Sequence, residues 1–186
     1  MPTLPSLAAA ILAVSLGLAA STAGADTPVS YTEGGSTLFT FDAPDFWTVH
    51  VGGPRDLADP RTRDTRPVNR VIGLQPATGQ GVWVGFVSPP GVRTFSDARD
   101  YLAEIGPFLV RDSVVERQGE RLIGGRAART LAGHGRRNGR AVSFTAVAID
   151  LPRDRMAIAV VVIEAGSPTD GIAGVNRMFA SFRAGR

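Results

Sequence analysis

The sequence predicts one α+β domain in which helices pack against a mostly antiparallel sheet of six to eight strands. Short segments with apolar residues at every second position are typical of half-buried strands, and they recur along most of the chain. Two other segments repeat apolar residues at helical spacing. No internal repeat or linker divides the 186 residues, so a single core is expected.

Residues 1–25 are predicted to be a secretory signal peptide. Positions 7–20 are apolar or small and uncharged, and Ala23-x-Ala25 matches the small-residue cleavage pattern. A membrane-spanning helix needs about 20 strongly apolar residues, whereas this run is shorter and rich in Ala, Ser and Gly. We therefore expect a mature protein that begins at Asp26 and is periplasmic or secreted.

The absence of cysteine limits the chemistry of the exported chain. Without Cys there are no disulfides, no thiol nucleophile and no residue for a lipid anchor. Every basic residue is Arg, the net charge is +3, and Arg and Asp are interspersed, which argues against a nucleic-acid-binding stripe. We expect a protein stabilised by its hydrophobic core, with no nucleic-acid partner and no transmembrane segment in its mature form.

The first part of the mature chain is expected to hold short strands joined by polar segments. Residues 26–36 are interpreted as a polar lead, and residues 54–69, rich in Pro, Arg and Asp, as a surface loop. Trp47 and Trp83 lie in alternating segments with apolar neighbours and are expected in or beside the core. The predicted strands are 37–41, 47–51, 70–74 and 81–88.

A first helix is predicted to begin near Thr94, because Thr94 and Asp97 have the spacing of a capping box, and Ser96 is an alternative N-cap. Gly106-Pro107 is expected to end the regular helix, since proline disfavours the α conformation at the preceding residue. The apolar stripe of this helix consists of Ala98, Leu102, Ile105 and Leu109.

The second half is predicted to be an antiparallel meander followed by a closing helix. Asn138-Gly139 indicates a type I′ turn, in which both central residues have positive φ. Residues 156–163 are apolar throughout, which indicates a central strand covered on both faces. Ser167 is expected to cap the closing helix, with Pro168 in its first position. The other predicted strands are 114–118, 121–123, 127–132 and 141–151, and the apolar face of the helix is Ile172, Val175, Phe179 and Phe182.

The order of these elements and three short motifs resemble PsbP-like domains. Residues 39–47 are similar to the opening F-x-F-x-x-P-x-x-W of that family, residues 123–128 to its Gly-x-x-Ala step, and residues 178–182 to its closing-helix signature. The resemblance extends over residues 38–182, so we expect one PsbP-like domain at 37–186.

This resemblance implies an αβα sandwich around a central, mostly antiparallel sheet. The superfamily includes photosystem II extrinsic subunits, Ran-binding Mog proteins and DcrB-type envelope proteins. Its members mostly act as binding or assembly factors, and no universal catalytic residue can be transferred to this sequence.

No catalytic constellation is recognised in the chain. No Ser lies in a G-x-S-x-G elbow, and His50 and His134 are the only imidazoles. Both are interpreted as surface or strand-edge residues, and a metal site that joins them lacks any spacing signature. The acidic residues of 54–69 alternate with Arg and do not match a calcium loop. We expect no catalytic residue, no metal and no cofactor.

The most concentrated positive charge lies at a predicted hairpin tip, where Arg136, Arg137 and Arg140 flank Asn138-Gly139. The nearby glycines do not form a phosphate loop, because a strand rather than a helix follows them. The charges are interpreted either as solvated or as a site that docks an acidic partner or an anionic lipid surface. These three arginines are the candidate binding residues.

Together these observations favour a non-enzymatic exported accessory or assembly protein that binds an envelope protein or surface. Two alternatives stay open. One is a small-molecule carrier with a pocket between sheet and helix, and the other is an enzyme of unrecognised type that depends on His50 or His134.

The predicted cleavage site determines where the exported protein should begin. N-terminal sequencing of the exported protein should begin at or near Asp26, because the small residues at positions 23 and 25 fit the signal-peptidase pattern. An exported protein that retains Met1 would contradict this interpretation.

Overall fold

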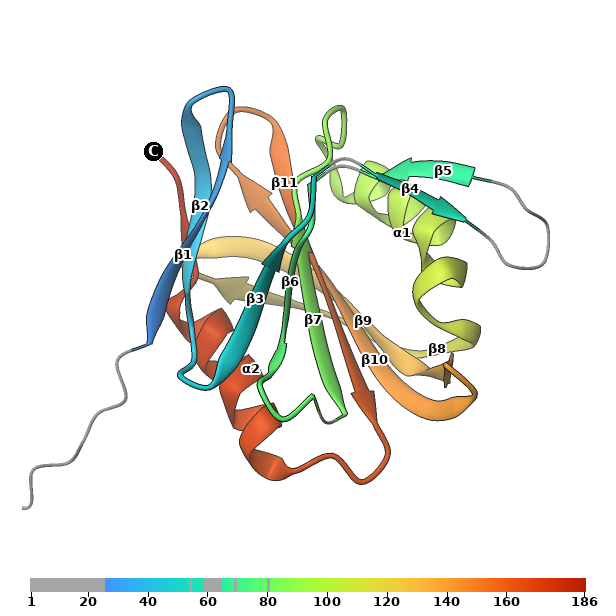
Figure 1. The fold of residues 1–186 in the computed structure, drawn as a ribbon. Coiled ribbons are helices and arrows are strands. Elements are labelled where there is room, and N and C mark those ends of the chain that lie inside the picture. The colour runs from blue at the N-terminus through green and yellow to red at the C-terminus, as the bar shows by residue number, and fades with distance from the viewer. Residues whose placement is uncertain (1–25, 54, 59–64, 69, 80) are drawn as a thin grey trace, which may run out of the picture.

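The computed structural model describes residues 26–53, 55–58, 65–68, 70–79 and 81–186. These residues form three layers, with a seven-stranded antiparallel sheet in the middle (Figure 1). Helix α1 (Phe95–Leu109) packs on one face, and α2 (Thr169–Ser181) packs on the other beside a three-stranded sheet. The predicted αβα sandwich is confirmed. The predicted signal peptide at 1–25 lies outside the described residues.

The central sheet places the most apolar strand in its middle. Residues 156–162 of β11 (Arg155–Glu164) are all buried, which confirms the prediction of a strand covered on both faces. The turn at Asn138-Gly139 has positive φ at both residues, 51° and 78°, as the Asn-Gly signal predicts. In spatial order the strands are β3 (Trp47–Val51), β6 (Ile72–Pro76), β7 (Val82–Val87), β11 (Arg155–Glu164), β10 (Arg140–Leu151), β9 (Arg126–Arg137) and β8 (Arg111–Ile123).

The three-stranded sheet corrects the interpretation of residues 26–36 as a polar lead. The sheet consists of β1 (Thr27–Glu33), β2 (Ser36–Ala43) and β12 (Arg183–Ala184), in the order β1-β2-β12. Val29 and Tyr31 of β1 are buried in the core. Only these two positions of β1 carry buried side chains, too few to stand out as an alternating pattern in the sequence.

The segment expected to be a surface loop also contains strands. Within residues 54–69, β4 (Arg55–Ala58) and β5 (Thr65–Val68) pair with each other as a separate two-stranded sheet. The other residues of this segment, 54, 59–64 and 69, lie outside the described residues. Backbone pairing does not require apolar side chains, so composition alone did not predict these two strands.

Helix α1 begins as predicted and ends later than predicted. The capping box is present: the Asp97 N–H donates to Thr94 Oγ1 at 3.1 Å, and the Thr94 N–H donates to the Asp97 carboxylate at 2.9 Å. Hydrogen bonds to the Asp97 carboxylate, first from the Arg93 N–H and then from the N–H and side chain of Thr94, lower the pKa of Asp97. The helix continues through Pro107, because a proline in the last turn removes only one helical hydrogen bond.

The start and one face of α2 differ from the prediction. Ser167 does not cap the helix, because its hydroxyl donates to the carbonyls of Gly81 and Glu164, and Pro168 occupies the N-cap position. Ile172 is exposed, while Met178 is fully buried and Val175 packs in the core as expected. Neither helix of the described residues is long and apolar enough to cross a bilayer.

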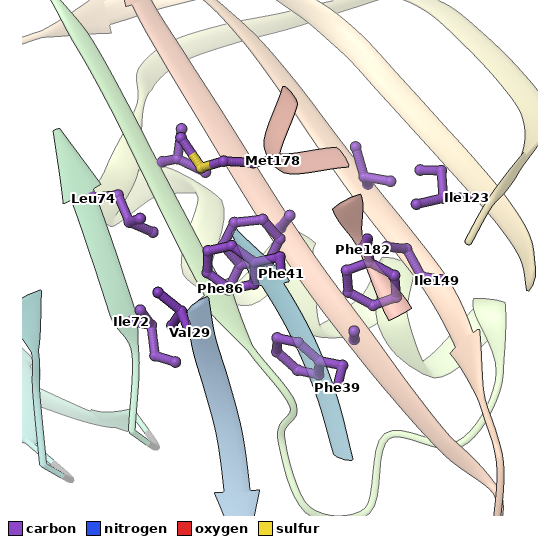
Figure 2. Close-up of a cluster of buried hydrophobic side chains, with 14 of the residues drawn as sticks. Val29, Phe39, Phe41, Ile72, Leu74, Phe86, Ile123, Ile149, Met178 and Phe182 are labelled. Carbon is purple, nitrogen blue, oxygen red and sulfur yellow. The ribbon is translucent and has the colours of Figure 1, made fainter. Parts of the chain in front are cut away.

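A stack of aromatic rings joins the small sheet, the central sheet and α2 (Figure 2). Phe41 of β2 stacks on Phe86 of β7 with ring centroids 4.3 Å apart. Phe39 stacks on Phe182, at the end of α2, with centroids 5.4 Å apart. All four rings are fully buried, so this stack is the centre of the core between the two sheets.

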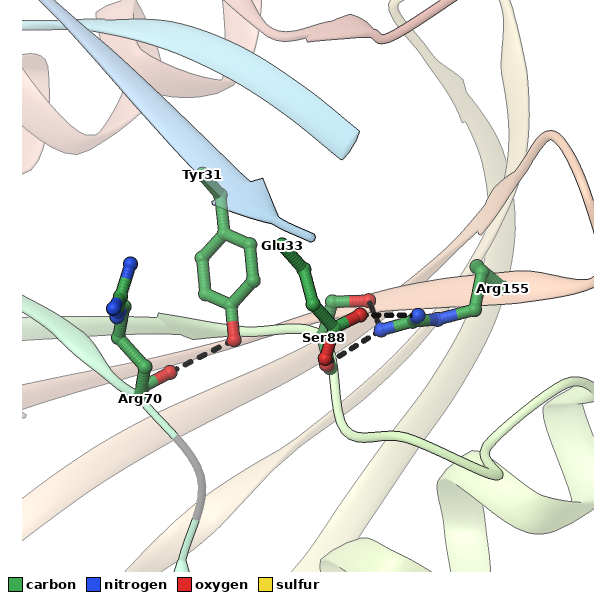
Figure 3. Close-up of polar contacts among 5 residues, drawn as sticks. All are labelled: Tyr31, Glu33, Arg70, Ser88 and Arg155. Atoms are coloured by element: carbon green, nitrogen blue, oxygen red, sulfur yellow. Dashed lines mark hydrogen bonds and ion pairs between the residues drawn. The ribbon is translucent and has the colours of Figure 1, made fainter. Parts of the chain in front are cut away.

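A polar cluster ties the outer end of β1 to the central sheet (Figure 3). The Arg155 guanidinium forms an ion pair with Glu33 and donates to the carbonyl and hydroxyl oxygens of Ser88 at 3.0 and 3.1 Å. The Tyr31 hydroxyl donates to the Arg70 carbonyl at 2.9 Å, and burial raises the pKa of this phenol. Ser88 is fully buried, so these bonds satisfy polar groups that water cannot reach.

The aromatic stack predicts that alanine substitutions at Phe41 and Phe46, which are close in the sequence, change the free energy of unfolding by unequal amounts. Phe41→Ala should lower the free energy of unfolding by about 3–5 kcal/mol, because it leaves a cavity in the core. Phe46→Ala should change it by less than about 0.5 kcal/mol, since the Phe46 side chain is 87% exposed. Urea unfolding of both variants measures the difference, and equal effects would show that the stack does not centre the core.

Candidate binding surface

The three arginines predicted to form one cluster lie in three different environments. Successive residues of a strand point to opposite faces, so Arg136 and Arg137 of β9 diverge. Arg140 begins the next strand on the far side of the turn. The structure therefore does not bring the predicted binding residues together.

Arg137 is packed against the protein. Its guanidinium lies over the Trp83 ring, 4.7 Å from the centroid, and burial lowers the pKa of the side chain. Its Nη1 atom is buried and has no hydrogen-bond partner among the residues that the structure describes. The Trp83 ring in turn covers Gly85, where a Cβ would lie 2.4 Å from Cη2 of the indole, so glycine is required there. Both tryptophans, Trp47 and Trp83, are half-buried beside the core, as predicted.

Arg140 is paired with a carboxylate. Its Nη1 donates to Glu164 Oε2 at 2.7 Å, and this charged hydrogen bond raises the pKa of Arg140. Glu164 ends β11, the strand next to β10. Arg140 is therefore neutralised within the sheet.

Arg136 is exposed and forms no ion pair with the described part of the chain, and it lies on an exposed arginine face. Arg111 of β8 is its cross-strand neighbour. Arg117 pairs with Ala132, which places it on the same side of the sheet as Arg136. All three side chains are exposed, and none forms an ion pair with another described residue. We call Arg111, Arg117 and Arg136 the arginine face.

Sequence reasoning missed Arg111 and Arg117 because β8 is irregular. The register shifts between Arg111 and Val114 and again between Val115 and Arg117, so the alternation of faces is broken twice. The prediction began this strand at residue 114 and divided it in two, whereas β8 runs unbroken over 13 residues. The strand is at the edge of the sheet, and among the described strands its one partner is β9.

The two histidines do not share a site. His134 Nδ1 lies 3.0 Å from Glu116 Oε1, and both side chains are about half exposed. Ser143 is the cross-strand neighbour of His134, but no hydrogen bond joins them in the described residues. His50 is exposed on β3, the opposite edge strand. Within the described ranges no group of three or more acidic or histidine side chains could hold a metal ion.

A cavity of about 600 Å³ lies between α1 and the strands β8, β9 and β10. It is on the opposite sheet face from the arginine face, since Arg129 and Leu131 alternate with Arg136 along β9. This cavity lies where the alternative prediction of a small-molecule carrier expects a pocket, between sheet and helix. We call it the α1 cavity.

Comparison with known proteins gives similarity of fold alone. No protein-family model matches the chain, and no curated protein matches it. The solved structure of PA94 from Pseudomonas aeruginosa is similar with 15% identity and a TM-score of 0.43, covering 83% of this chain and 94% of that chain. LpqN of Mycobacterium tuberculosis, a protein involved in cell envelope biogenesis, is similar with 14% identity and a TM-score of 0.44, covering 87% and 91%.

A cyanobacterial PsbP from Synechocystis is also similar, with 13% identity and a TM-score of 0.47 over 88% of this chain and 95% of that chain.

The different environments of Arg136 and Arg137 can be tested directly. Arg137→Ala should lower the free energy of unfolding by about 1–2 kcal/mol and shift tryptophan emission to longer wavelength, because it uncovers Trp83. Arg136→Ala, one residue away and exposed, should leave the emission unchanged and should not lower the free energy of unfolding, because it removes a like charge opposite Arg111. Equal behaviour of the two variants in urea unfolding and fluorescence would contradict this assignment.

Proposed function

We propose that this chain is an exported, non-enzymatic accessory protein that binds an acidic component of the cell envelope through the arginine face. The observation that carries the proposal is the exposure of Arg111, Arg117 and Arg136 on one side of the sheet without carboxylate partners among the described residues. Export is inferred from the sequence of residues 1–25.

The arrangement of charge supports an acidic partner. Like charges directly opposite each other on neighbouring strands, such as Arg111 and Arg136, destabilise the sheet. A bound carboxylate or phosphate would relieve this repulsion. Glu116 of β8 contacts His134, and among the described residues it forms no ion pair with Arg111 or Arg136.

The environment of His134 supports binding rather than catalysis. A catalytic serine needs a hydrogen bond from its hydroxyl to the base, and the bond between Ser143 and His134 is not formed in the part of the chain that the structure describes. The His134–Glu116 pair is half exposed, so solvent screens it. An ordinary surface ion pair accounts for its geometry.

A second candidate function, the carriage of a small molecule, is favoured by the α1 cavity. Its volume of about 600 Å³ falls in the range of small-molecule sites, about 300–1,000 Å³. The two functions use opposite faces of the sheet and can therefore be tested separately.

The arginine face should be tested by affinity purification from the native envelope fraction. The Arg111→Gln/Arg136→Gln double variant should retain its partner about tenfold less well than the wild type at low salt, because two exposed charge contacts are lost. Association of the wild type should weaken as salt rises. The control is Arg93→Gln/Arg177→Gln, which removes the same charge from exposed positions elsewhere.

The partner is then recovered either from the solubilised proteins or from the extracted lipid, which distinguishes a protein from a surface. Retention of the same partners by the double variant at every salt concentration would refute the arginine face as the binding surface. Equal losses in the double variant and its control would show a general charge effect and would refute it as well.

A further inference from the structure

The α1 cavity has an apolar floor made mostly of small side chains. Ala146 and Ala148 of β10 point toward α1 and line the cavity, together with Leu131 of β9. Leu102 of α1 faces them from the helix and is only partly buried. Two methyl groups in place of larger side chains leave a space under the helix that the neighbouring residues do not fill.

The strand wall and the helix wall of the cavity each contribute one arginine to its rim. Arg129 extends from β9, with its guanidinium 4.7 Å from the centroid of the Phe95 ring and 2.9 Å from Glu120. Arg99 extends from α1 on the opposite side. Its ion pair with the adjacent Asp100 is 3.5 Å long and about 70% exposed on both sides, so it holds the guanidinium weakly.

The charged side chains that line the cavity are Arg99, Arg129 and Glu120. Each arginine has a carboxylate neighbour, because Glu120 is bonded to Arg129 and the exposed Asp100 pairs weakly with Arg99. A bound anion would compete with these two exposed contacts. Ser96 of α1 adds a hydroxyl group to the lining. An apolar floor below two arginines is complementary to a molecule that has an apolar body and one anionic group.

We propose that the α1 cavity binds an amphipathic organic anion. The apolar body, of the size of a medium acyl chain or an aromatic ring, packs on Ala146, Ala148 and Leu102. The carboxylate lies at the rim between Arg99 and Arg129. This site is independent of the arginine face, because it uses the other side of the sheet and none of the same residues.

Binding of sodium octanoate, measured by isothermal titration calorimetry, tests this proposal. Octanoate should bind the wild-type protein saturably at one site, and 1-octanol, which lacks the charge, at least about tenfold more weakly. Ala146→Leu should weaken octanoate binding by about tenfold or more, because the larger side chain occupies the floor. The matched control is Ala103→Leu, the same substitution on the exposed side of α1, which should leave binding unchanged.

A rim variant keeps the test decisive if Ala146→Leu fails to fold. Arg99→Gln, at an exposed helical position, should weaken octanoate binding by several-fold and abolish most of the preference over octanol. The absence of saturable binding to the wild type would refute the site. So would equal affinities for octanoate and octanol, or unchanged affinity in Arg99→Gln. The Arg111→Gln/Arg136→Gln variant should bind octanoate normally, so failure of the cavity and failure of the arginine face are distinguishable.

Discussion

The contact between Phe41 and Phe86 is the interaction on which the rest of the structure depends. It joins the small sheet to the central sheet at a centroid distance of 4.3 Å, and the neighbouring Phe39 brings in Phe182 from the end of α2. The N-terminal and C-terminal ends of the described chain therefore meet in one core, where β12 pairs with β2. The polar cluster of Arg155, Glu33 and Ser88 secures the same sheet at its outer end.

Both proposed binding sites follow from a difference in length between strands and helices. Strands β8, β9 and β10 have 12 or 13 residues and so extend about 40 Å, whereas α1 with 15 residues is about 22 Å long. The helices consequently cover only part of each sheet face. On the α2 side the uncovered strands present the arginine face, and on the α1 side small residues beneath the helix leave the cavity.

The hairpin tip shows how tertiary structure distributes charges that are adjacent in the chain. Arg137 packs on Trp83, Arg140 is paired with Glu164, and Arg136 is left to solvent beside Arg111. A substitution at Arg137 therefore changes packing, one at Arg140 removes an ion pair, and one at Arg136 changes the surface potential. The basic surface of the molecule comes from two strands rather than from one turn.

Local signals in the sequence determined the fold class, the Asn138-Gly139 turn, the Thr94 capping box and the buried strand at 156–162, because each depends on residues close together in the chain. Strand β1 was missed because its two buried residues are recognised only from the core they enter. Two helix ends differ from the local prediction because of specific hydrogen bonds. The Val110 N–H bonds the Gly106 carbonyl at the end of α1, and the Ser167 hydroxyl bonds the Gly81 carbonyl instead of capping α2. The arginine face and the α1 cavity arise from register, bulges and layer packing, which bring distant residues together and which only the tertiary structure defines.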